Sequence, residues 1–126
     1  MRQAVSAPNA AKPIGPYSPG IRAGNLLFVS GQVGFDPSTG ALVDGGITSQ
    51  TDQVMRNIGT LLKAAGADFT HVVRTTVFLA DIDEFAAMND VYGRYVVDPP
   101  PARSTVQVAR LPRDARVEID VIAVID

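Results

Sequence analysis

The sequence contains no cysteine and only one histidine, His71, among its 126 residues. The absence of cysteine excludes disulfides, thiolate zinc sites, iron–sulfur clusters and cysteine nucleophiles. A zinc enzyme is also disfavoured, because one imidazole and carboxylates alone make a poor set of zinc ligands. We therefore expect chemistry that uses neither a thiol nor a metal, and we expect His71 to be a surface or edge residue.

The sequence also lacks an excess of either charge and any long apolar run. Eleven basic residues face thirteen acidic ones, for a net charge of −2, which disfavours a nucleic-acid-binding protein. Arg110, Arg113 and Arg116 do cluster, and we interpret them as a solvated loop. No apolar stretch is long enough to span a bilayer, and the N-terminus does not resemble a secretory signal. We expect a cytoplasmic protein.

The residues that are present predict one α+β domain over residues 1–126. Hydrophobic residues make up 46% of the chain, which is enough for one core at this length. Apolar spacing predicts a helix over 47–65, capped by Thr48 or Ser49 and ended by Gly66, and a second helix that begins at 81 and ends near 96. Strands are predicted at 24–35, 71–80, 103–109 and 116–125. This order favours a mixed sheet with two helices packed on one face.

The last two predicted strands carry polar residues at alternating positions. Their short connection leads us to expect antiparallel neighbours, which would place Arg103, Thr105, Glu118 and Asp120 on one face. A solvated sheet face with an ordinary cross-strand ion pair is the alternative explanation of this pattern.

The C-terminal stretch PPARSTVQVARLPRDARVEIDVIAV resembles the signature of the RidA family, reactive intermediate deaminase A, which is also called YjgF. Three further blocks agree in type and order with that family: IGPYS at 14–18, VSGQ at 29–32, and the segment that runs from Phe85 through Asn89 to Tyr92. The resemblance extends over nearly the whole chain.

The resemblance implies a chorismate-mutase-like fold that assembles as a homotrimer around a central β-barrel, with ligand sites between subunits. It implies hydrolytic deamination of reactive 2-imino acids, such as 2-iminobutanoate and 2-iminopropanoate, to 2-keto acids and ammonia without a cofactor. The expected partner is thus a small-molecule substrate. A non-catalytic module that binds a small keto or amino acid is the second hypothesis. An endoribonuclease or translation inhibitor is a third, less favoured one.

The resemblance also suggests roles for individual residues. Arg103 would bind the substrate carboxylate, because a guanidinium fork pairs with a planar carboxylate through two hydrogen bonds. Glu118 would act near the attacking water, as a proton relay or only as an orienting group. Arg103 and Tyr17 would act in catalysis as well as in substrate binding. The other expected substrate-binding residues are Ser30, Gly31, Asn89 and Thr105, and each of the site residues has a purely structural role as its alternative.

Two departures from the family pattern affect the expected pocket. Thr105 stands where some relatives carry cysteine, so no thiol chemistry is expected there. The proline-rich link around 99–101 looks shorter than in familiar relatives, which leaves the shape of the pocket rim open.

Overall fold

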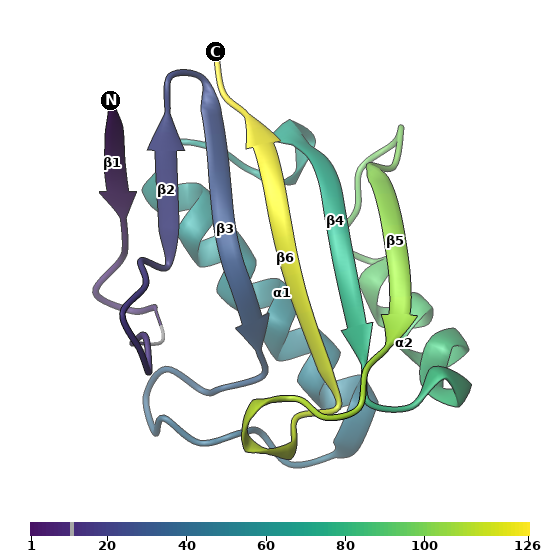
Figure 1. The fold of residues 1–126 in the computed structure, drawn as a ribbon. Coiled ribbons are helices and arrows are strands. Elements are labelled where there is room, and N and C mark those ends of the chain that lie inside the picture. Colours follow the sequence, from purple (N-terminus) through teal and green to yellow (C-terminus); the bar gives the residue numbers. More distant parts are fainter. Residues whose placement is uncertain (11) are drawn as a thin grey trace.

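The computed structural model of the protein describes residues 1–10 and 12–126. A six-stranded sheet in the order β1-β2-β3-β6-β4-β5 carries two helices on one face (Figure 1). The predicted α+β arrangement is confirmed. The strands are β1 Arg2–Val5, β2 Gly20–Ala23, β3 Leu26–Val33, β4 Val72–Leu79, β5 Ala102–Gln107 and β6 Val117–Val124, the helices are α1 Gly46–Ala64 and α2 Phe85–Tyr92, and three 3₁₀ turns are η1 Phe69–His71, η2 Ile82–Glu84 and η3 Pro112–Asp114.

The predicted pairing of the last two strands is wrong. β6 lies between β3 and β4, while β5 pairs in parallel with the far side of β4. The connection over 108–116 therefore passes the end of β4 and returns to the middle of the sheet. Crossing one intervening strand takes only about 10 Å, so a link that looked like a hairpin is also long enough for this crossover.

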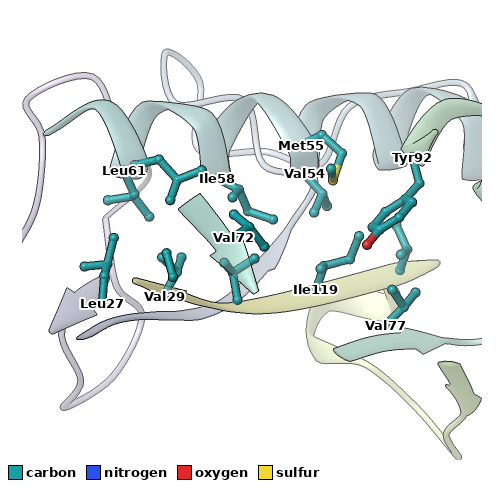
Figure 2. Packing of buried hydrophobic residues seen from close by; sticks show 14 of the residues in the cluster. Leu27, Val29, Val54, Met55, Ile58, Leu61, Val72, Val77, Tyr92 and Ile119 are labelled. Carbon is teal, nitrogen blue, oxygen red and sulfur yellow. The ribbon is translucent and has the colours of Figure 1, made fainter. Parts of the chain in front are cut away.

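The two faces of the sheet differ in what covers them. On β6, the residues Val117, Ile119, Val121 and Ala123 are buried towards the helices, and the residues between them lie on the uncovered face. Figure 2 shows Ile119 beneath the apolar side of α1. The alternation predicted for this strand is confirmed.

Arg103 and Glu118 lie on opposite faces, so the expectation of a shared face is wrong. Arg103 is in register with Thr75, which is buried on the helix side of β4, and Thr105 is in register with buried Val77. Glu118 is in register with Phe78, which points to the uncovered side with Asp120. The parallel register with β4, rather than a hairpin with β6, determines which way β5 presents its side chains.

Helix α1 forms where the predicted apolar stripe lies, and it supplies much of the core. Its buried face includes Val54, Ile58 and Leu61, which pack onto the sheet (Figure 2). Gly66 has a φ of 77° just beyond the last turn, as predicted. The predicted Thr48 or Ser49 cap is wrong, because the helix begins after Gly45, whose φ of 108° favours glycine, and no side chain caps it.

The second helix is shorter than predicted and the N-terminal strands were not predicted. α2 ends at Tyr92, since the backbone then tightens into turns: the N–H groups of Arg94 and Tyr95 donate to the carbonyls three residues earlier, those of Val91 and Tyr92. Strands β1 and β2 have four residues each, too few to show a clear alternation. Within the described residues, neither helix is long and apolar enough to cross a membrane.

A small second apolar cluster closes one end of the uncovered face. It contains Val33, Phe35, Leu111 and Ala115, with Phe78 packed against it. This cluster holds the crossover that precedes β6 against the sheet, close to the position of Glu118.

Candidate functional site

Glu118 is the half-buried carboxyl of the uncovered sheet face. Its register neighbours are Val33 on β3 and Phe78 on β4, so the adjoining positions are apolar. Burial raises the pKa of Glu118, and the negative charge of Asp120 on the same face raises this pKa further. A raised pKa brings a carboxyl closer to proton exchange near neutral pH, as acid–base catalysis requires.

Gly31 leaves the space that Glu118 occupies. It lies where β3 departs from regular pairing with β6, between Val29 and Gln32. A Cβ atom at Gly31 would lie 2.8 Å from Glu118 Cδ and would also collide with Oε2. The absence of a side chain at this position is therefore a steric requirement for the Glu118 carboxyl.

Ser30 anchors the loop that carries Tyr17. Its hydroxyl donates to the Ser18 carbonyl at 2.6 Å, and its N–H donates to the Pro19 carbonyl at 2.9 Å. Both the hydroxyl and the N–H of Ser30 thus donate within the chain. Tyr17 is 46% exposed, and its hydroxyl accepts a hydrogen bond from the Ile14 N–H at 3.4 Å.

Tyr17, Gly31 and Glu118 line one pocket of about 50 Å³, together with Phe35 and Pro112. This volume holds at least one water molecule. It is far below the roughly 300 Å³ of a typical ligand pocket. The pocket has room for a reacting water but needs a further wall to enclose a substrate.

Arg103 lies on the helix side of the sheet, near the β5 edge. Its guanidinium carbon is 4.8 Å from the centroid of the Tyr92 ring and 5.4 Å from that of Phe85. Within the described residues no acidic side chain forms an ion pair with it. The charge of this guanidinium is therefore available to an anionic ligand.

Two more of the expected site residues lie on this side. Asn89 is half-buried between the positions of Phe85 and Tyr92 on one face of α2, as its helical spacing dictates. The hydroxyl of Thr105 is buried and has no hydrogen-bond partner among the described residues. A buried hydroxyl without a partner is costly, so it marks a place where a ligand or another chain would supply one.

The expected residues thus divide into two groups. The carboxyl-side group comprises Tyr17, Ser30, Gly31 and Glu118, and the arginine-side group comprises Asn89, Arg103 and Thr105. Arg103 on β5 and Glu118 on β6 are separated by the intervening strand β4, and their register partners on β4 are three residues apart. This displacement across and along the sheet places their Cα atoms roughly 14 Å apart. Because their side chains also point to opposite faces, one small substrate does not reach both within a single chain.

The aromatic residues beside Arg103 were not predicted as part of a site. In the sequence, Phe85 and Tyr92 belong to a family block in the predicted second helix, and no role in the site is expected of their rings. Their spacing of seven residues, with Asn89 between them, was the available signal for a polar group held between two rings. The strand pairing that brings Arg103 to them was not available from the sequence.

Three other polar groups singled out in the sequence, His71, Arg110 and Arg116, have structural partners. His71 Nδ1 accepts from the Asp68 N–H at 3.1 Å in a capping box at η1. In the basic loop, Arg110 pairs with Asp114, and Arg116 pairs with Glu84. Among residues 1–10 and 12–126, no three acidic or imidazole groups are close enough together to hold a metal ion.

Comparison with known proteins identifies close relatives along almost the whole chain. The family described as Endoribonuclease L-PSP matches residues 7–125. The chain is 48% identical over 124 residues to the 2-iminobutanoate/2-iminopropanoate deaminase of Mus musculus, which covers 98% of this chain and 92% of that protein.

Solved structures of similar proteins have the same fold. RidA from an Antarctic Psychrobacter species superposes with a TM-score of 0.94 at 40% identity, over 98% of this chain and 99% of the other. TdcF of E. coli, solved with bound serine, superposes with a TM-score of 0.92 at 34% identity, over 98% and 99% of the two chains.

Proposed function

Because this chain belongs to the Endoribonuclease L-PSP family, the RidA family that its sequence resembles, we propose that it deaminates small 2-imino acids by hydrolysis, without a cofactor. The observation that carries this proposal is Glu118, a half-buried carboxyl of raised pKa in a pocket large enough for water. The proposed substrates are 2-iminobutanoate and 2-iminopropanoate, in keeping with the names of relatives that are 45–49% identical.

The proposed site lies between two copies of the chain in a homotrimer. The separation of Arg103 and Glu118 on opposite faces supports this, since two copies could bring the carboxyl-side group of one against the arginine-side group of the next. Three apolar residues on the uncovered sheet face are partly exposed to solvent: Leu26 is 37% exposed, Phe28 41% and Val106 43%. A trimer with a chorismate-mutase-like central barrel would bury these apolar side chains.

Arg103 is the proposed carboxylate clamp. Its guanidinium has no acidic partner among the described residues, and two parallel hydrogen bonds to a carboxylate would orient the substrate. One relative was solved with serine, an amino acid whose carboxylate has the same geometry. Asn89 and Thr105 would add neutral hydrogen bonds on this side, and the unpartnered Thr105 hydroxyl supports that role.

Glu118 is the proposed proton relay for the attacking water. Its carboxylate accepts a proton from the water as the water oxygen bonds to C2, and it passes that proton to the imine nitrogen, which gives a carbinolamine. Glu118 then accepts the carbinolamine hydroxyl proton as C=O forms and donates this second proton to the departing nitrogen as the C–N bond breaks. Both water protons thus reach the nitrogen, ammonia and a 2-keto acid leave, and the enzyme is unchanged.

The other carboxyl-side residues would shape the water position. Tyr17 lies in the same pocket as Glu118 and would hydrogen-bond the water or the carbinolamine hydroxyl. Ser30 would hold the Tyr17 loop, and Gly31 would keep the space beside the carboxyl open.

A coupled assay tests the proposed activity. Threonine dehydratase supplies 2-iminobutanoate from threonine, semicarbazide traps free imine, and release of 2-ketobutyrate is followed. We expect the wild type to outcompete the trap and Arg103→Ala to lose about 100-fold or more in rate, since two charge-assisted hydrogen bonds are removed. The matched control Arg94→Ala removes an exposed arginine that pairs only with Asp90, and it should behave as wild type. Full activity in Arg103→Ala would refute the clamp.

A non-catalytic binding module is the second candidate, and the relative solved with serine favours it. Calorimetry with serine and 2-ketobutyrate distinguishes the two functions. If the protein binds these ligands through Arg103 but turns over none of the 2-imino acids supplied, the enzyme hypothesis is wrong and the binding-module hypothesis is supported. Light scattering tests the assembly independently: three chains of 13.3 kDa make about 40 kDa, and a stable monomer would contradict a site between copies.

A further inference from the structure

The described arginines differ in what their guanidinium groups contact. Four of them form ion pairs with carboxylates, namely Arg56, Arg94, Arg110 and Arg116, and Arg113 lies over the single ring of Phe35. Arg103 lies instead against the rings of Phe85 and Tyr92, and it is half-buried. An aromatic face attracts a cation and displaces water from it without cancelling its charge. Arg103 is thus ordered and partly desolvated while it remains free to pair with an anion.

The Tyr92 ring is itself fixed by a buried hydrogen bond. Its hydroxyl and the Thr75 hydroxyl are 2.8 Å apart, and the two residues are only 5% and 3% exposed. Thr75 is the register neighbour of Arg103 across the β4–β5 pair. The three residues are therefore connected in a ring of contacts: Thr75 on β4 hydrogen-bonds Tyr92, the Tyr92 ring contacts the Arg103 guanidinium, and Arg103 on β5 pairs with Thr75. Figure 2 shows Tyr92 pointing from its helix towards the sheet.

A second connection holds the helix beside the strand. The Gln107 side chain at the end of β5 accepts a hydrogen bond at 2.8 Å from the Ile82 N–H, in the turn that leads into α2. Phe85 begins that helix and Tyr92 ends it. The position of α2 against β4 and β5 is thus set at two places: at Thr75, the register neighbour of Arg103, and at Gln107, the end of β5.

We infer that Phe85 and Tyr92 are positioning residues that hold the Arg103 fork for a substrate carboxylate, and that Thr75 acts through the Tyr92 ring. This inference rests on the proposed function, because it concerns the carboxylate clamp of that site. It deepens the assignment of substrate class: ligands with a planar anionic carboxylate bind, and the two rings set how tightly they do so.

Binding of 2-ketobutyrate, measured by calorimetry, tests the inference without any turnover assay. We expect no measurable binding in Arg103→Ala and a Kd raised about three- to tenfold in Phe85→Leu, which keeps an apolar side chain but removes the ring face. Tyr92→Phe keeps the ring and removes its hydroxyl, and should raise the Kd about threefold. Arg94→Ala, which removes an exposed arginine paired with Asp90, is the control and should bind as wild type.

An NMR signature separates positioning from general destabilisation. Ring currents should move the Arg103 Nε–H proton upfield from its position in a free arginine, and the signal is identified by its loss in Arg103→Ala. Phe85→Leu should return it towards the free position while the urea unfolding midpoint stays close to that of the wild type.

The outcomes distinguish this inference from the proposed function. Wild-type protein that binds no 2-ketobutyrate, or an Arg103→Ala variant that binds it equally well, would overturn the clamp and this inference with it. Binding that is lost in Arg103→Ala but unchanged in both Phe85→Leu and Tyr92→Phe would overturn the positioning role alone and leave the proposed function standing.

Discussion

Mixing two inactive variants should restore activity if the site lies between copies. Arg103→Ala removes the proposed clamp, and Glu118→Gln removes the proposed proton relay. The two positions lie on opposite faces of one sheet with their Cα atoms roughly 14 Å apart. Each complete site would therefore take its arginine from one copy and its glutamate from the next.

The size of the recovery follows from this geometry. After joint unfolding and refolding of an equal mixture, a site is intact only where a Glu118→Gln copy supplies the arginine and an Arg103→Ala copy supplies the glutamate. Each condition is met about half the time in a randomly assembled cyclic trimer. We expect about one quarter of the wild-type rate from the mixture and only background from either variant alone.

The assay is release of 2-ketobutyrate from threonine and threonine dehydratase in the presence of semicarbazide. A mixture of Arg103→Ala with the double variant Arg103→Ala/Glu118→Gln is the control, because no pairing of those chains yields an intact site. If mass spectrometry shows mixed trimers but the first mixture stays at background, the reasoning about opposite faces is refuted.

Three further predictions concern the carboxyl side of the site and its support. Gly31→Ala should displace the Glu118 carboxyl, since the new Cβ would lie 2.8 Å from Cδ. Deaminase turnover should therefore fall by at least tenfold while far-ultraviolet circular dichroism is unchanged, and wild-type turnover would count against the steric argument. The pKa of Glu118 is raised in the folded chain, so ionisation of this carboxyl destabilises the fold. The stability that the neutral carboxyl contributes is fully present below the ordinary pKa of 4.5 and is lost as pH rises through the folded pKa. As the pH rises above 4.5, the unfolding temperature of Glu118→Gln should therefore increase relative to that of the wild type, and a constant difference would contradict the raised pKa. Asn57→Ala should lower the free energy of unfolding in urea by about 1–3 kcal/mol, because the buried amide donates to the carbonyls of Val33 and Phe35. A loss below the error of the urea titration would show that these carbonyls find other partners.

Where an apolar pattern is long, it predicts both the element and the side that faces the core. The apolar spacing of α1, its end at Gly66, and the alternation along β6 were all predicted, because each depends on residues close together in the chain. The blocks of family motifs were equally local, and the comparisons confirm the family that they indicated. Strands β1 and β2 were not predicted, since a strand of four residues is too short to show a clear alternation of apolar and polar side chains.

The distribution of the site residues over the two faces of the sheet depends on strand pairing, which the local pattern does not reveal. The order β3-β6-β4-β5 separates Arg103 from Glu118 and turns their side chains to opposite faces. Strand pairing is decided by hydrogen bonds and burial between distant segments, so the local pattern of β5 and β6 was compatible with either a hairpin or a crossover. The raised pKa of Glu118 and the aromatic neighbours of Arg103 follow from that packing, because desolvation and ring contacts exist only once the chain has folded.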